Sequence, residues 1–340
     1  MLQNEIKTSQ NLLNESKQLA VCGWAREPIL AYDRSELKNA LWSGREWDRY
    51  VIQSKEYALS LCIADYGYFG LATAMLIDFR GEMRRYIKTK IKPMTLGQLN
   101  MPGSTRAGDA NFDNRKLGMK FSRSANNRYI KSEFMNFHDG KMLTVSLALD
   151  NPDDNSIVVA SPFQQNSYAF AYCQKVIGMP ASGFVKFGGE EFTFDASDSR
   201  AFLDWGRGVL PRDSQWFWGA LSDKLSGKEF GFNFGGGLGD TSQGSENAIF
   251  FDGKLYKVSG LSVQPPKGAE KNWRFFTKNR RIQIQFTPFL DCGEDRRLLT
   301  VSLEQKLQFG VFSGRVILED GQEFTIKKMR GFCNWAHNRF

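Results

Sequence analysis

Acidic side chains recur beside aromatic residues in this 340-residue chain. Asp65 precedes Tyr66, Asp204 precedes Trp205, and Glu246 follows a run rich in phenylalanine and glycine. A carboxyl group packed among rings loses hydration, so its pKa rises and it can donate a proton at neutral pH. We therefore predict Asp65, Glu246 and Asp204 as candidate catalytic acids. The structural alternative is that these acids cap turns or form ion pairs with arginines.

A second set of residues has the chemistry of ligand binding. Tryptophan faces stabilise developing positive charge, amides orient water or an oxygen atom, and an arginine anchors an acidic substituent or fixes a carboxyl group. An apolar pocket with a few polar groups that orient the ligand is the usual form of a small-molecule site. The candidate ligand-binding residues are Tyr66, Arg207, Trp216, Trp218, Asn233, Asp240 and Asn247.

Residue counts argue against several other chemistries. Only two histidines occur, His138 and His337, which leaves little for a histidine-rich metal site or a catalytic triad. The five cysteines are scattered and never form a C-x-x-C pair, so zinc sites and disulfide frameworks are disfavoured. The glycine-rich run at 230–240 lacks the Lys-Ser/Thr pair of a phosphate-binding loop. We predict no metal and no cofactor.

The chain carries a formal charge of +8, with its densest basic run at residues 84–92. Such a run is either a nucleic-acid stripe or a solvated hairpin face. Acidic residues are interspersed and no nucleic-acid motif accompanies the run, so we favour the solvated face and predict no specific nucleic-acid partner. Docking on an anionic membrane rests on the charge alone.

Residues 57–77 are almost uncharged over the length of a membrane span. Asp65 lies at their centre and Gly67 and Gly70 interrupt them, which favours a buried β-hairpin and no transmembrane segment. The N-terminus lacks an apolar core of signal-peptide type. With reduced cysteines, this predicts a cytoplasmic protein, for which peripheral membrane contact stays open.

The elements that position the candidate site residues should be strands. Helical periodicity is weak, whereas alternating apolar residues mark 143–149, 184–194, 282–286 and 315–326, the second and fourth as hairpins. The DGK triplets at Asp139 and Asp252, and the pairs Ser182-Gly183 and Ser313-Gly314, recur in the same order and suggest a duplicated β unit. We predict a partly helical N-terminal segment at 1–45 and two barrels, at 46–200 and 201–340.

Motifs along nearly the whole chain resemble the bacterial DUF2804 family. They include Gly23-Trp24-Ala25-Arg26, Trp47-Asp48, Asp204-Trp205-Gly206-Arg207-Gly208, Trp216 with Trp218-Gly219, Glu246-Asn247, and the closing Gly331-Phe332 with His337-Asn338-Arg339. The resemblance implies an all-β architecture similar to tandem lipocalin-like barrels, such as carotenoid hydratases and pericyclase-type cyclases. It supplies no catalytic residue, because the family offers none with an established role. The likeness to hydratases and cyclases is one of fold, and fold does not fix function.

Two function classes follow. The first is a cofactor-independent enzyme that hydrates, isomerises or cyclises a lipophilic small molecule, using a carboxyl acid in an aromatic pocket at a barrel mouth or between the barrels. The second is a carrier, in which the same pocket binds a hydrophobic ligand and does no chemistry. Many acids beside rings favour the enzyme, since a carrier does not need them.

Overall fold

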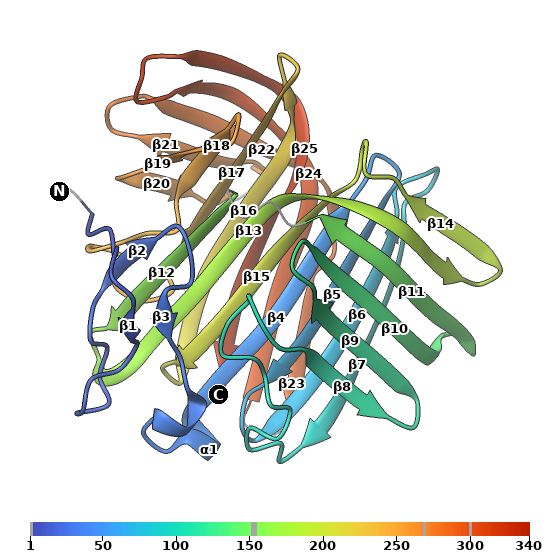
Figure 1. The fold of residues 1–340 in the computed structure, drawn as a ribbon. Coiled ribbons are helices and arrows are strands. Elements are labelled where there is room, and N and C mark those ends of the chain that lie inside the picture. The colour runs from blue at the N-terminus through green and yellow to red at the C-terminus, as the bar shows by residue number, and fades with distance from the viewer. Residues whose placement is uncertain (1–2, 151–154, 268–269, 299–300) are drawn as a thin grey trace.

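A computed structural model describes residues 3–150, 155–267, 270–298 and 301–340. The fold is all-β, as predicted, and consists of two curled sheets preceded by a short N-terminal segment (Figure 1). That segment contains β1 (Gln10–Asn11), β2 (Gly23–Ala25), β3 (Leu30–Ala31), a 3-10 turn at Arg34–Glu36 and α1 (Ala40–Ser43). In the described part of the chain, no helix is long and apolar enough to span a membrane.

The first sheet has the order β7-β6-β5-β4-β15-β13-β11-β10-β9-β8, with β12 and β14 paired to β13 and β2 to β12. Its strands are β4 (Gly44–Gln53), β5 (Tyr57–Asp65), β6 (Phe69–Asp78), β7 (Arg84–Pro93), β8 (Ala110–Asn114), β9 (Leu117–Arg123), β10 (Asn127–His138), β11 (Lys141–Asp150), β12 (Ser156–Phe163), β13 (Asn166–Phe187), β14 (Glu190–Phe194) and β15 (Arg200–Val209).

The second sheet has the order β19-β18-β17-β16-β25-β24-β22-β21-β20, with β23 paired to β24. Its strands are β16 (Asp213–Leu225), β17 (Lys228–Gly236), β18 (Ala248–Phe251), β19 (Lys254–Lys257), β20 (Leu261–Gln264), β21 (Trp273–Thr277), β22 (Ile282–Asp291), β23 (Glu294–Leu298), β24 (Val301–Ile317) and β25 (Glu323–Arg339).

The two sheets repeat one strand order. Because β15 is part of the first sheet, the second sheet begins at β16 and not at residue 201. Gly183 and Gly314 occupy equivalent places, each between an inner strand and a hairpin partner. At each, an added Cβ would lie within 2.2 Å of a carbonyl oxygen of the neighbouring strand. The DGK match is wrong: Asp139 turns between β10 and β11, whereas Asp252 turns between β18 and β19, which correspond to β6 and β7.

The apolar core is divided among the two barrel interiors and the space between them. One cluster fills the first barrel, and a phenylalanine-rich cluster including Phe232 and Phe312 fills the second. A third cluster joins Val51 and Phe202 of the first sheet to Trp218 and Phe332 of the second. The predicted buried hairpin is β5 paired with β6, and the basic run is β7, a sheet edge whose exposed cations discourage pairing with other chains.

Candidate functional site

A buried lysine that joins two carboxylates lies between the two sheets. Lys175 of β13 is 2% exposed, and its Nζ is 2.5 Å from Oδ1 of Asp204 and 3.5 Å from Oε2 of Glu246. A buried charge is strongly unfavourable unless it is paired and hydrogen-bonded. The three groups therefore form one ionic cluster, which brings together two of the three predicted catalytic acids.

Tryptophan rings surround this cluster. The ring centre of Trp218 is 5.0 Å from Nζ of Lys175, close enough for a cation-π contact. Trp47 donates from Nε1 to Oδ1 of Asp204 at 3.0 Å and stacks on Trp216, with ring centres 6.3 Å apart. The cluster thus has the aromatic surroundings expected from the sequence, with Trp47 in addition.

Strand register explains why these side chains meet. Lys175 and Asp204 are directly opposite on β13 and β15, so both side chains project from the same face of the sheet. Gly206 is opposite Trp47 on β4, and an added Cβ at Gly206 would lie 2.0 Å from the Trp47 ring. The absence of a side chain at Gly206 therefore lets the indole lie flat against β15 and reach Asp204.

Glu246 is held by the loop between β17 and β18. Asn233 accepts a hydrogen bond from the Trp218 indole at 2.7 Å and donates to the backbone oxygen of Glu246 at 2.9 Å. Asn247 accepts from the backbone N–H of Gly235 at 2.8 Å, and an added Cβ at Gly235 would lie 1.7 Å from Oε1 of Glu246. The predicted ligand-binding residues Trp218, Asn233 and Asn247 therefore position Glu246.

Burial and mutual charge shift the proton affinities in this cluster. Burial raises the pKa of Glu246, opposed by Lys175 and reinforced by Asp204. Burial disfavours the charged form of Lys175, but the carboxylates of Asp204 and Glu246 outweigh it and raise the pKa of the ammonium group. Lys175 therefore stays a cation, while Glu246 is the carboxyl group of the cluster whose affinity for a proton is raised.

Two cavities adjoin the cluster, and a third is lined by ring neighbours of Tyr66. An inner cavity of about 60 Å³ is lined by Trp47, Tyr66, Asp204 and Trp216, and also by the charged side chains Arg49, Glu294 and Arg296. A smaller one of about 20 Å³ lies beside Glu246 and Ser161, and Ser161 Oγ is buried with no hydrogen-bond partner among the described residues. A basal cavity of about 920 Å³ opens where β4 begins and β15 ends. Its lining includes Arg45, Trp42, Met94, Leu210 and Phe340.

Tyr66 lies between the linings of the basal and inner cavities. Its ring contacts Phe69 and Phe340, which line the basal cavity, at 5.6 and 5.3 Å between ring centres, while Tyr66 itself lines the inner one. Burial raises the pKa of the Tyr66 phenol, so it stays protonated. The predicted ligand-binding residue Tyr66 thus lies between the open cavity and the ionic cluster.

Asp65, the third predicted acid, lies apart from the cluster. Its carboxylate accepts hydrogen bonds from the backbone N–H groups of Gly67 at 2.9 Å, Gly97 at 3.4 Å and Leu99 at 3.3 Å. It also accepts from Thr95 Oγ1 at 2.9 Å. Its oxygens therefore fix the β5–β6 turn and the loop after β7. Asp65 thus caps turns, as in the structural alternative to a catalytic role.

Arg207 also has a positioning role. It projects from β15 on the face opposite Asp204, and its guanidinium contacts Asp48 at 2.8 Å and donates to the backbone oxygens of Trp47 and Pro102. Asp240 is a turn residue that accepts from Ser242 N and Gln164 Nε2, and these hydrogen bonds lower the pKa of its carboxyl group. Neither belongs to the cluster.

Sequence reasoning missed Lys175, Trp47 and Ser161. The signal for Lys175 was available, because it is the single charge within the mostly apolar run 169–179. Trp47 appeared only as part of a motif. Among the described residues, no group of three or more His, Cys, Asp or Glu side chains could hold a metal ion.

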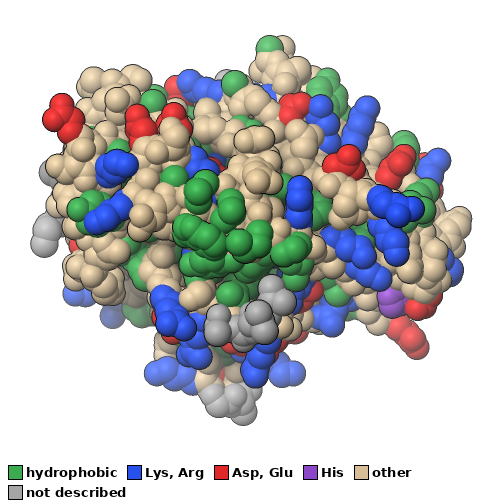
Figure 2. All heavy atoms as spheres, turned by 90° about the horizontal axis from the view of Figure 1, so that it is seen from below, with side chains coloured by type: hydrophobic (Ala, Val, Ile, Leu, Met, Phe, Trp, Pro, Cys, Tyr) green, Lys and Arg blue, Asp and Glu red, His purple; other side chains and the backbone are tan. Residues whose placement is uncertain are grey.

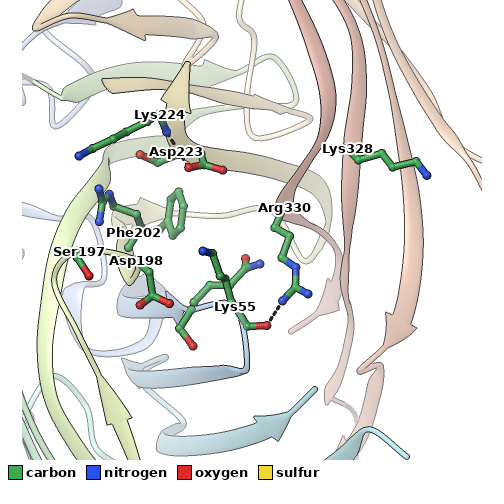
Figure 3. A pocket seen from close by; sticks show the side chains of 12 residues that line it. Lys55, Ser197, Asp198, Phe202, Asp223, Lys224, Lys328 and Arg330 are labelled. Carbon is green, nitrogen blue, oxygen red and sulfur yellow. Dashed lines mark hydrogen bonds between the residues drawn. The ribbon is translucent and has the colours of Figure 1, made fainter. Parts of the chain in front are cut away.

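A different cavity lies at the opposite end of the space between the sheets, where β4 ends and β15 begins (Figure 3). It measures about 350 Å³, with Lys55 and Arg330 on one side and Asp223 and Lys224 on another. Arg330 donates to the backbone oxygen of Lys55. It contains none of the predicted site residues, so we do not assign it to the site.

Two curled antiparallel sheets in one repeated strand order define the class of tandem lipocalin-like barrel proteins. Within that class, the chain belongs to the DUF2804 family, a domain of unknown function whose model matches residues 3–340. No curated protein sequence matches the chain.

Two solved structures are similar in fold. An AttH-like protein from Nitrosomonas europaea is 13% identical with a TM-score of 0.54, covering 91% of this chain and 97% of that one. Kievitone hydratase from Nectria haematococca is 13% identical with a TM-score of 0.49, covering 92% and 93%. At this identity the first similarity supports the shared fold alone.

Proposed function

We propose that this protein is a cofactor-independent enzyme that transfers a proton to a carbon–carbon double bond of a lipophilic small molecule. The observation that carries the proposal is the Asp204–Lys175–Glu246 cluster, buried among tryptophans beside an inner cavity. Buried titratable groups with shifted proton affinities are typical of catalytic sites, although structural ion pairs share this property. Protonation is the first step common to hydration, isomerisation and cyclisation.

The ligand would occupy two neighbouring spaces. The basal cavity, at about 920 Å³, has the size of a small-molecule site and would hold the apolar body. The inner cavity, at about 60 Å³, admits only the reactive end, which would pass Tyr66 and Phe340 by side-chain rotation. Asp204 lines the inner cavity beside Trp47 and Trp216, whose ring faces can stabilise a carbocation.

The proton would move along the cluster. Lys175 first gives a proton to the Asp204 carboxylate and takes one from the Glu246 carboxyl group in its place. The protonated Asp204 then gives its proton to one alkene carbon. The cluster then has lost one proton and the substrate has become a cation. Loss of another proton from that cation completes an isomerisation, and addition of water followed by proton loss completes a hydration. In both cases the released proton restores Glu246.

The small cavity beside Glu246 favours exchange with water. A volume of about 20 Å³ suffices for one water molecule, and Ser161 Oγ and the Glu246 carboxyl group are the partners it would need. Such a water molecule would return a proton to Glu246 on the side of the cluster away from the ligand.

The competing proposal is a carrier, favoured by the basal cavity, which could bind a lipophile without any reaction. Solvent extraction of the purified protein and mass spectrometry would identify the ligand, which is then incubated with fresh protein. The variants Asp204→Asn and Glu246→Gln test the cluster, and Asp240→Asn is a matched control outside it.

If the protein is an enzyme, the wild type and Asp240→Asn should convert the extracted ligand. Glu246→Gln should still bind the ligand but no longer convert it. A ligand that is bound and released unchanged by all four proteins would show a carrier. Conversion that survives both cluster substitutions would contradict the proposed proton path.

A further inference from the structure

An exposed apolar surface surrounds the mouth of the basal cavity. We name it the basal face and define it by Leu41, Trp42, Ile91 and Met94, whose exposed fractions are 54%, 46%, 43% and 51%. Figure 2 shows a continuous apolar patch on the side of the molecule that is seen from below. Scattered apolar side chains on a surface are ordinary, whereas a contiguous patch marks an interaction site.

Two segments far apart in sequence form the basal face. Leu41 and Trp42 belong to α1, Ile91 lies near the end of β7, and Met94 directly follows that strand. Trp42 and Met94 both line the basal cavity, and the Trp42 ring is 6.0 Å from that of Tyr68, another lining residue. The exposed apolar surface is therefore continuous with the wall of the cavity that we assign to the ligand.

Cationic side chains border the basal face. Lys38 lies two residues before α1, Lys92 lies between Ile91 and Met94, and Arg212 lines the basal cavity. All three side chains are exposed. Lys and Arg side chains flank the apolar patch on several sides in Figure 2. A half-exposed tryptophan beside cations suits the headgroup region of a bilayer, where rings and lysines take up interfacial positions.

We infer that the basal face docks on anionic lipid bilayers, so that a lipophilic substrate passes from the bilayer into the basal cavity. The apolar side chains insert among the acyl chains near the surface, and the cations contact the lipid headgroups. The passage of a substrate from the bilayer into the basal cavity rests on the proposed function, whereas the docking itself depends only on the basal face.

Vesicle flotation tests the docking. The full chain is mixed with phosphatidylcholine vesicles that contain or lack phosphatidylglycerol, at low and high salt. We expect binding to the anionic vesicles that weakens as salt is added, since screening reduces the attraction between cations and headgroups. The variant Leu41→Ser/Met94→Ser should weaken partitioning by about tenfold or more, because two apolar anchors are lost.

Met135→Ser/Met142→Ser is the matched control, because these methionines are 53% and 49% exposed on β10 and β11. It should bind vesicles as the wild type does. Equal losses in both double variants, or no binding of the wild type to anionic vesicles, would overturn the inference. It would also be wrong if the free protein were a dimer that Leu41→Ser/Met94→Ser converts to monomers, since a second copy would then cover the surface.

Glu246→Gln separates this inference from the proposed function. The substitution lies away from the basal face, so vesicle binding should persist even though conversion is lost. Vesicle binding by a wild-type protein that converts no ligand would support the docking and refute the enzyme. Conversion of dissolved ligand without vesicle binding would support the enzyme and refute the docking.

Discussion

Replacing Lys175 by methionine should destabilise the fold in a way that depends on pH. Lys175 is 2% exposed and neutralises Asp204 at 2.5 Å and Glu246 at 3.5 Å. Removal of one partner from a buried ion pair typically costs about 3–5 kcal/mol, because the remaining charge is buried without compensation. Here the charge of Asp204 would remain buried without its cation, so we expect Lys175→Met to lose about 3–5 kcal/mol of unfolding free energy at neutral pH.

The loss should shrink in acid. In Lys175→Met, burial and the second carboxylate would keep the pKa of Glu246 raised with no cation to oppose them. The folded variant then binds a proton that the unfolded chain releases above about pH 4.5, so its stability falls as pH rises through that value. Urea unfolding followed by tryptophan fluorescence, at about pH 5 and about pH 7.5, measures the difference.

The matched control is Lys186→Met on the same strand. Lys186 pairs with Glu191 at 3.2 Å, but the two side chains are 56% and 50% exposed. Exposed pairs contribute about 0–1 kcal/mol, so this variant should stay near wild type at both pH values. If Lys175→Met cost no more than Lys186→Met, or if its loss did not change between the two pH values, the reasoning about the cluster would be refuted.

Three further predictions concern the surroundings of the cluster. Gly206→Ala drives a methyl group into the Trp47 ring, 2.0 Å from the new Cβ, and should cost about 1–3 kcal/mol and alter the near-ultraviolet circular dichroism of tryptophan. Gly235→Ala places its methyl group 1.7 Å from Oε1 of Glu246, so ligand conversion should fall more than ligand binding. Burial lowers the pKa of Lys257 to about 7, against the opposing charge of Glu246. The unfolded chain keeps that proton to about pH 10, so this group makes stability rise between pH 7 and pH 10, and Lys257→Met should remove the rise in urea unfolding across that range.

The sequence allowed much of the fold to be predicted, because strand signals are local. Alternation at 143–149 and 282–286 lies within β11 and β22, and the glycine pair at 188–189 turns between β13 and β14. Pairing partners are not local, and this is why the DGK turns were matched incorrectly. A tight turn needs the same residues wherever it occurs in a sheet, so its sequence does not specify which strands it joins.

The candidate site was only partly predictable for a similar reason. Asp204 and Glu246 were found from their aromatic neighbours, but Asp65 has similar neighbours and binds backbone N–H groups. Lys175 was missed because a lysine within an apolar strand gains meaning only from the carboxylate on the next strand. Which acids share a face depends on register, and one sequence does not contain that information.

The short passage from β15 to β16 limits how the two barrels can move. Val209 ends a strand of the first sheet and Asp213 begins one of the second, and four peptide steps extend to about 14 Å at most. At this end of the molecule the barrels are thus tethered beside the basal cavity, which Val209 and Arg212 line. A wide hinge opening is disfavoured there, so exchange of a ligand would depend on the rotation of side chains such as Tyr66 and Phe340. The rate of ligand exchange should therefore fall as these side chains become bulkier.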